Sequence, residues 1–254
     1  ARLAGDPQMS ILASLARAYD RLPDAPPFGY STEKIGFLVA LNEDGTVAHV
    51  ADLRSSNGKK KQARSLNVPT SFKRSGTTPR PFFLWDNANY ALGASIDIDP
   101  DDRRFEAFRV RHLKFLQNET DVGLSAFRAF LERWSPADVD KWAPRDELRV
   151  EKIAFALESE RRETLLHERH RARQLWGEIS ADWRAVEGKE PSERICLVTG
   201  LVGPIARTHP AIRGIPSKGG KDADSIVSFN EKAFESYGHE QGDNAPVSEA
   251  AAFA

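Results

Sequence analysis

A run of cations without a single acid is the feature of this sequence with the clearest chemistry. Between Asp52 and Asp86 there are eight Lys and Arg residues and no Asp or Glu. The whole chain has a net charge of −1, so subtracting these eight charges leaves −9 for the remaining residues. A near-neutral total therefore conceals a concentrated positive segment, which is typical of a surface that binds a polyanion. The eight cations are Arg54, Lys59, Lys60, Lys61, Arg64, Lys73, Arg74 and Arg80.

Small polar residues fill the spaces between these cations. Ser and Thr hydroxyls suit phosphate oxygens, and the amides of Asn57, Gln62 and Asn67 suit the edges of bases. Glycines at 58 and 76 allow a backbone to approach a ligand closely. We expect a long loop here, because the strand pattern dissolves after Leu53 and returns only at Pro81. Two interpretations remain open from the residues alone: a loop that binds a polyanion, or a solvated basic loop without a partner.

Other residues with chemical potential carry weaker patterns. His167 and His170 lack the HExxH spacing of a zinc-protease helix, so a solvated helix face is favoured. The Lys-Gly-Gly-Lys segment at 218–221 lacks the spacing of a nucleotide P-loop, and we interpret it as a mobile basic loop that touches an anion. Cys196 lies in an apolar run and is most simply a core residue, and its spacing from His209 gives no support to a nucleophile–base pair. We expect no catalytic site, no bound metal and no cofactor.

The composition is that of a globular protein with a heavily charged surface. The 254 residues are 40% hydrophobic and 29% charged, and the single cysteine excludes a disulfide scaffold. No apolar run approaches the length of a membrane span, and the N-terminus lacks the apolar core of a signal peptide. We therefore expect a soluble, cytoplasmic protein that has no membrane partner.

The two ends of the chain predict a fragment of a longer protein. Residues 1–8 precede Met9, the only methionine, and we interpret them as a leader outside the native protein. Pro246 is followed by strong helix formers, but the chain stops soon afterwards. A helix that short is marginal alone, so we expect residues 9–254 to be the N-terminal domain of a longer chain.

Mixed elements must position the cationic segment. Apolar spacing predicts a helix over residues 9–22, and residues 35–41 and 46–53 predict two strands joined by an Asn-Glu-Asp-Gly turn. Short strands are expected at 81–85 and near 90–92.

The middle of the chain, about 101–186, is predicted to be largely helical. Apolar positions predict helices over 105–116 and 124–134, a short one from 135, and a long polar one over about 161–186, with a strand at 149–157. Further strands are expected at 195–198 and 225–229. Because strands and helices do not alternate regularly, the fold class is α+β with a mixed or antiparallel sheet and no repeated βαβ unit.

Several segments, taken in order, resemble one protein family. They are Phe82-Phe83-Leu84-Trp85-Asp86-Asn87, 196–200, 205–214, 226–230, 233–238 and 241–248. Together they resemble the large subunit of the type I-C (Dvulg subtype) CRISPR-associated surveillance complex (Cascade), and the match runs from Met9 to the end. Members of that family are much longer, so the resemblance implies that a C-terminal helical domain is absent from this chain.

The resemblance implies a non-enzymatic role in DNA recognition. The family's large subunit engages the protospacer-adjacent motif in duplex DNA, opens the duplex so that the guide RNA can pair, and helps to recruit a separate nuclease-helicase. The implied partners are duplex DNA, the guide-RNA ribonucleoprotein subunits and that nuclease-helicase. Base pairing would supply sequence discrimination, while the protein reads a short motif and the backbone.

Under this hypothesis the cationic segment is the DNA-binding site. The expected phosphate contacts are Lys59, Lys60, Lys61, Arg64, Lys73 and Arg74, and the amides of Asn57, Gln62 and Asn67 would reach base edges. Lys218 and Lys221 form a second, weaker nucleic-acid site. Two alternatives stay open. The first is an adaptor that docks neighbouring subunits or the guide RNA. The second is a nuclease, although the sequence shows no clustered carboxylates at the spacing of a metal site.

Overall fold

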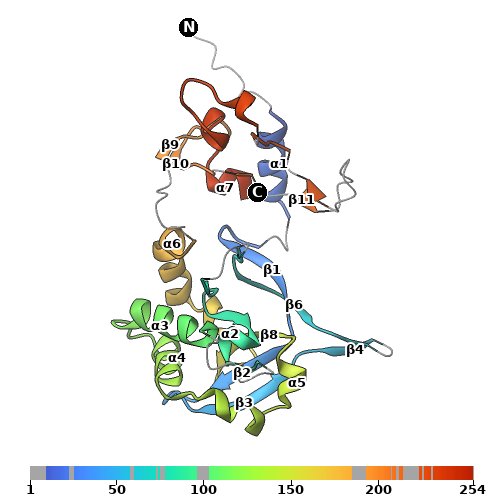
Figure 1. Cartoon of the computed structure of the whole chain (residues 1–254), viewed down its shortest axis with the longest axis vertical. Helices are drawn as coiled ribbons and strands as arrows, with labels where there is room; N and C mark the ends of the chain where they lie inside the picture. Colours follow the sequence, from blue (N-terminus) through green and yellow to red (C-terminus); the bar gives the residue numbers. More distant parts are fainter. Residues whose placement is uncertain are drawn as a thin grey trace. The chain divides into compact units, whose positions relative to one another are not determined.

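The structure, a computed structural model, divides the chain into two compact units (Figure 1). The first unit joins the ends of the chain, Ala1–Phe28 and Ala185–Ala254, and the second is Gly29–Arg184. Residues 1–8, predicted to be a leader, lie outside the described part of the chain. The described residues are 10–22, 26–57, 60–72, 74, 78–95, 103–184, 193–206, 208–209, 212–213, 223–224, 226–229 and 231–253.

A four-stranded mixed sheet is the centre of the second unit. Its strand order is β3 (Val47–Asp52), β2 (Phe37–Leu41), β8 (Lys152–Leu157) and β7 (Trp85–Asn87). β2 runs antiparallel to β3 and parallel to β8. Every residue of β2 is buried, as an almost wholly apolar strand requires when both faces of the sheet are covered. The mixed sheet confirms the predicted α+β class, and the predicted hairpin of the strands at 35–41 and 46–53 is also confirmed.

Helices α3 (Arg104–Leu116), α4 (Val122–Arg133) and α6 (His170–Arg184) supply most of the helical side of the main core. Phe127 and Phe130 of α4 place their rings against Phe155 of β8. The helices predicted at 105–116 and 124–134 are therefore confirmed. The remaining helical elements of this unit are α2 (Ala88–Ala91), η1 (Pro136–Lys141), α5 (Arg145–Leu148) and η2 (Leu166–Glu168).

The long polar helix predicted over about 161–186 begins later than expected, at His170. Arg169 has an extended backbone (φ −58°, ψ 143°), which interrupts any helix that would run through it. Its guanidinium is bound to Asp121 and Glu160, and these ion pairs hold the break in place. The short strand predicted near 90–92 is also wrong, because Tyr90 lies in α2.

The long loop predicted after Leu53 is wrong in its first half, which forms strands. β4 (Ser55–Asn57) and β5 (Lys60–Gln62) form a hairpin, and β6 (Arg64–Pro69) pairs antiparallel with β1 (Tyr30–Ile35) as a separate ribbon. Leu66 and Val68 alternate with polar residues along β6, which is a weak strand signal. In β4 and β5 the main-chain pairing occurs without any apolar alternation, so hydrophobic periodicity could not identify these strands.

The strand predicted at 81–85 begins only at Trp85. Leu84 has a left-handed backbone conformation (φ 59°), which is costly for a non-glycine residue. Its side chain is fully buried, and its amide donates to His112 at 3.0 Å. Tertiary contacts therefore override the strand preference of this apolar run.

The first unit is built from short elements. α1 (Ile11–Tyr19) packs on α7 (Glu249–Phe253), where Phe253 receives edge-on ring contacts from Tyr19 and Phe28. The strands β9 (Glu193–Ile195) and β10 (Val202–Pro204) form one pair and β11 (Ile212–Arg213) and β12 (Ala223–Asp224) another. The 3-10 helices are η3 (Lys232–Phe234) and η4 (Gln241–Asn244).

Two strand predictions in the first unit are wrong in extent. After Ile195 the chain turns, so Cys196 alone of the run 195–198 is buried, whereas Ile195 and Leu197 are exposed. The described residues of the run 225–229, which are 226–229, form a bend at 226–227 and no strand. The prediction that Cys196 is a core residue is confirmed, since it packs with Val247 and Ala251.

Two histidines are completely buried in the second unit. His112 donates from Nδ1 to the Phe108 carbonyl at 2.7 Å, because a carbonyl oxygen only accepts, and its Nε2 accepts from Leu84. His167 of η2 likewise donates from Nε2 to the Asn67 carbonyl of β6 at 3.0 Å. Burial lowers the pKa of His112 to about 3 and that of His167 to about 4, so both are neutral in the folded protein.

This burial predicts a loss of stability in mild acid. A histidine in the unfolded chain has a pKa of about 6.5. As the pH falls below that value, the histidine of the unfolded chain becomes protonated, whereas the buried histidine of the folded protein stays neutral. Each buried histidine then removes up to about 1.4 kcal/mol per pH unit from the free energy of unfolding. His167→Gln keeps a donor for the Asn67 carbonyl but does not titrate.

Urea unfolding of the wild-type chain and of His167→Gln at about pH 7, 6 and 5 checks this expectation. The wild-type stability should fall more steeply than that of the variant below about pH 6.5, because all other groups are shared. A stability difference that does not change with pH would contradict it.

Candidate nucleic-acid interface

The predicted cationic site is built in part on a projecting hairpin. Figure 1 shows β4 and its partner strand leaving the body of the second unit as an arm. The antiparallel register pairs Ser55 with Gln62 and Ser56 with Lys61. Successive residues of a strand point to opposite faces, so Lys61 and Gln62 belong to different faces of the arm.

Arg54, directly before β4, is not an exposed cation. Its side chain is only 6% exposed and forms ion pairs with Asp52 (2.8 Å), Glu147 (2.5 Å) and Glu151 (3.3 Å). Its guanidinium also lies 4.4 Å from the centre of the Phe37 ring. Hydrogen bonds from Arg54 hold the pKa of Asp52 well below its usual range, so this carboxylate remains charged. Arg54 is therefore occupied by contacts within the protein.

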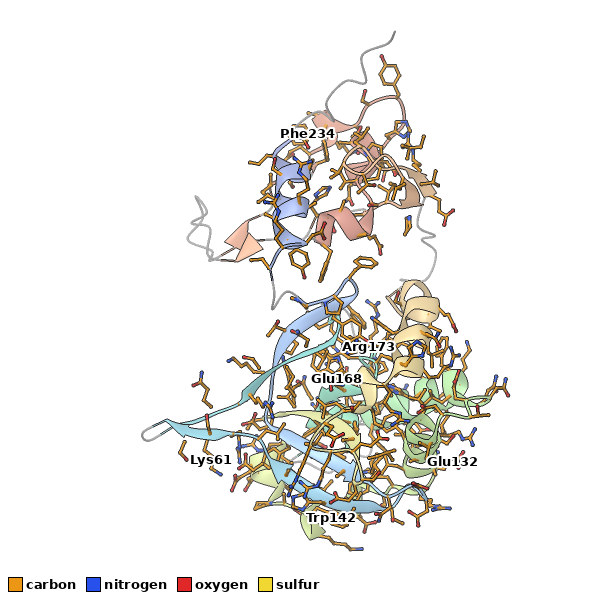
Figure 2. The ribbon with its side chains drawn as sticks, turned by 180° about the vertical axis from the view of Figure 1, so that it is seen from behind. Lys61, Glu132, Trp142, Glu168, Arg173 and Phe234 are labelled. Carbon is orange, nitrogen blue, oxygen red and sulfur yellow. The ribbon has the colours of Figure 1, made fainter. Side chains whose placement is uncertain are left out.

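Lys61 belongs to the same group of charges. Its ammonium lies 3.2 Å from Asp52 and 3.1 Å from Glu147. The side chain is half exposed, and Figure 2 shows it on the projecting arm. A phosphate would have to displace these two carboxylates to reach it. We therefore leave Lys61 out of the phosphate contacts that we propose below.

Arg74 is also paired within the fold. Its guanidinium binds both carboxylate oxygens of Asp86, at 2.6 and 2.5 Å, and Asp86 is fully buried. Arg74 also lies 3.9 Å from the ring centres of Phe82 and Tyr90. Burial raises the pKa of Asp86 to about 6, although the hydrogen bonds from Arg74 oppose the rise. We assign Arg74 to this buried ion pair and not to the interface.

Gln62, Arg64 and Asn67 follow one another along β5 and β6. Gln62 and Arg64 are exposed. Asn67 is half-buried, and its Oδ1 accepts a hydrogen bond of 2.8 Å from Thr32 of β1. The first two side chains are open to a ligand, whereas Asn67 is already used in part by the ribbon.

One exposed cation beside this ribbon lies outside the acid-free segment. Lys34 of β1 stands opposite Ser65 of β6 and donates to its hydroxyl at 2.8 Å. Glu33, its neighbour in β1, points to the other face, where Lys152 pairs with it at 2.6 Å. The alternating exposure of residues along β1 is the signal for this arrangement, and a strand predicted to begin only at Ile35 leaves these residues out.

Several predicted contacts cannot be placed. Lys59, Lys73, Lys218 and Lys221 lie outside the described residues, and of Lys60 only the backbone, opposite Asn57, is described. Their roles in DNA binding stay predictions. The structure therefore brings Lys60, Gln62 and Arg64 together along the arm and its continuation into β6.

The structure gives His167 and Cys196 places inside the fold. His167 is buried against β6, so the prediction of a solvated face is wrong for it, whereas His170 is exposed. The Cys196 sulfur accepts from the amides of Val198 and Ser248. Within the described ranges, no three His, Cys, Asp or Glu residues are grouped so that they could hold a metal ion. Nor does any helix in that part of the chain have the length and apolar content to cross a membrane.

Comparison with known families identifies the chain at a coarse level. Residues 15–254 match the family described as CRISPR-associated protein (Cas_Csd1). The chain belongs to this family. No curated protein matches it. The match confirms the CRISPR-associated character that the sequence segments predicted, and the projecting arm is therefore a feature of a Cas_Csd1 protein.

The Arg74–Asp86 pair generates a prediction that separates stability from ligand binding. Arg74→Ala leaves the buried Asp86 without its counterion, so the free energy of unfolding at pH 7 should fall by about 3–5 kcal/mol. The loss should be smaller at about pH 5, where Asp86 can take up a proton. Urea unfolding at both pH values measures it.

Arg64→Ala is the matched control for this experiment. This substitution removes the same charge from an exposed position, so the free energy of unfolding should change by no more than about 0.5 kcal/mol. Equal stability of the two variants would contradict the structural role of Arg74.

Proposed function

We propose that this Cas_Csd1 protein is the DNA-recognition subunit of a CRISPR RNA-guided surveillance complex. In this role it binds the protospacer-adjacent motif in duplex DNA and promotes opening of the duplex, so that the guide RNA can pair. The membership of residues 15–254 in a CRISPR-associated family supports the setting. The finer assignment, to the large subunit of the type I-C complex, rests on the resemblance of the sequence segments described above.

The projecting arm carries the proposal. A two-stranded β-ribbon has the width to enter the DNA major groove, which is about 12 Å wide, and other proteins read DNA with such ribbons. The strands of the arm contain Asn57, Lys60 and Gln62, and Lys59 directly precedes Lys60 in the sequence. Amides of the kind that Asn57 and Gln62 carry suit base edges. Arg64 continues the cationic character into β6. Contacts of the lysines to phosphates would set the register, and the amides would read the motif.

The rest of the chain fits this division of labour. Outside the acid-free segment the sequence carries a charge of −9, which disfavours DNA everywhere except at the arm. Base pairing with the guide supplies most of the sequence discrimination, so the protein needs to read only a short motif. The proposed partners are duplex DNA, the guide-RNA ribonucleoprotein subunits and a nuclease-helicase that joins in trans.

An adaptor role is the alternative. In that case the arm would dock a neighbouring subunit or the guide RNA, and duplex DNA would be bound elsewhere in the complex. The pairing of Lys61 and Arg74 with carboxylates favours this alternative, since it occupies two of the cations that were expected to contact phosphates. Salt dependence of DNA binding separates the two roles.

The DNA-recognition proposal predicts a steep salt dependence that the arm lysines supply. Each phosphate neutralised adds about 0.9 to the slope of log K against log salt for duplex DNA. The double variant Lys59→Ala/Lys60→Ala should therefore bind duplex DNA more weakly, with a slope lower by up to about 1.8. Fluorescence anisotropy with a labelled duplex over a salt series measures both quantities.

Lys141→Ala is the control, because Lys141 is an exposed lysine of the same unit that lies outside the arm and is paired with Asp138. It should leave affinity and slope almost unchanged. If the arm variant and the control behave alike, the arm is not the DNA site, and the adaptor role becomes the better explanation.

We also propose that the protein is not an enzyme. Incubation of the chain with duplex or single-stranded DNA and Mg²⁺ or Mn²⁺ should give no cleavage products, because the part of the chain that the structure describes holds no group of three His, Cys, Asp or Glu residues that could bind the ion. Products seen on a denaturing gel, and lost on adding a chelator, would overturn this part of the proposal.

A further inference from the structure

The arm needs an anchor, because it has little packing of its own. β4 and β5 form a separate two-stranded sheet, and isolated hairpins of this kind are marginal in water. Ser55, Ser56, Lys61 and Gln62 are all exposed, so no apolar side chain on these strands ties the arm to the core. Its direction is therefore set at its two ends, where it follows β3 at Arg54 and where it continues into β6 at Arg64.

The contacts of Arg54 have the form of such an anchor. The guanidinium binds Asp52, the last residue of β3, Glu147 of α5, and Glu151, which directly precedes β8. Lys61, on the returning strand of the arm, shares Asp52 and Glu147 with Arg54. Both strands of the arm are thus attached to the same two carboxylates.

The charges of this group argue against a phosphate-binding role for it. Three carboxylates face two cations, so the group carries a net charge of −1. Asp52 and Glu147 lie within hydrogen-bond distance of the Lys61 ammonium, so they would repel a phosphate that approaches Lys61. The arrangement has the properties of an internal hold on the arm and not of an open anion site.

We propose that Arg54, Asp52, Glu147 and Glu151 are positioning residues that fix the direction of the arm for DNA binding, and that Lys61 belongs to this anchor and does not contact DNA. The inference rests on the proposed function, because it assumes that the arm is the DNA-binding element. It assigns a role to two acidic residues distant in sequence from the cationic segment.

The effect of Glu147→Gln on DNA affinity separates two possible roles of Glu147: repulsion of DNA and attachment of the arm. If Glu147 merely repels DNA, its neutralisation should tighten binding. If it holds the arm, its neutralisation should weaken binding by about tenfold, because the arm then has to be ordered when DNA binds. The slope against salt should stay unchanged in the second case, since no phosphate contact is lost.

Two further variants complete the test. Glu132→Gln is the matched control: Glu132 is an exposed carboxylate of α4, and Figure 2 shows it on the side of this unit away from Lys61. It should bind DNA like the wild type or slightly more tightly. Arg54→Lys keeps the positive charge but loses most of the hydrogen bonds of the guanidinium. Its affinity for DNA should therefore lie between that of the wild type and that of Glu147→Gln.

Limited proteolysis reports on the anchor without DNA. Trypsin should cut after Lys60 and Lys61 several times faster in Glu147→Gln than in the wild type or in Glu132→Gln. Urea unfolding of each variant should show that the unit itself remains folded.

The outcomes distinguish the anchor from the proposed function. Faster cutting together with weaker DNA binding at an unchanged salt slope supports the inference. Tighter DNA binding or unchanged cutting in Glu147→Gln overturns it. Faster cutting with unaltered DNA binding supports the anchor but overturns the DNA-binding role of the arm, and with it the proposed function.

Discussion

The parallel pairing of β2 with β8 is the constraint on which the second unit depends. Both strands are buried almost throughout, and residues 42–151 lie between them. Because their apolar side chains need cover on both faces, α4 must lie against the pair and the other helices must pack around it. The ribbon of β1 and β6, and the arm beyond it, begin where the chain leaves this sheet.

Several cations of the acid-free segment form ion pairs within the fold. Among the described residues of the acid-free segment, Arg54, Lys61 and Arg74 are paired with carboxylates, all of which lie outside the segment, and Glu147 is far from it in sequence. A local charge count therefore overstates the cations that are available to a ligand. The chain has 36 basic and 37 acidic residues, so pairing between distant segments is to be expected.

Hydrophobic periodicity was sufficient to predict the sheet hairpin at 35–53 and helices α3 and α4, because their burial imposes a regular apolar pattern. The arm could not be found this way, since its strands pair through the main chain between polar residues. The ribbon offers only the weak alternation of Leu66 and Val68 in β6, although Val68 and Ile35 are buried in one apolar cluster. The candidate interface, too, could be predicted only in part. The exposed Gln62 and Arg64 were identified from composition, but the attachment of Arg54 to Glu147 spans 93 residues and leaves no local signal.

Gly36, between β1 and β2, connects the sheet to the ion pairs of Arg54. Its amide donates to the Lys152 carbonyl and its carbonyl accepts from Leu53, which joins β8 and β3 across this one residue. A Cβ atom here would come within 2.3 Å of the Glu151 carboxylate and within 2.9 Å of the Glu151 Cβ. A side chain at this interior glycine would therefore disturb the sheet and displace Glu151 from Arg54 at the same time, so the packing of the core and the direction of the arm depend on one residue.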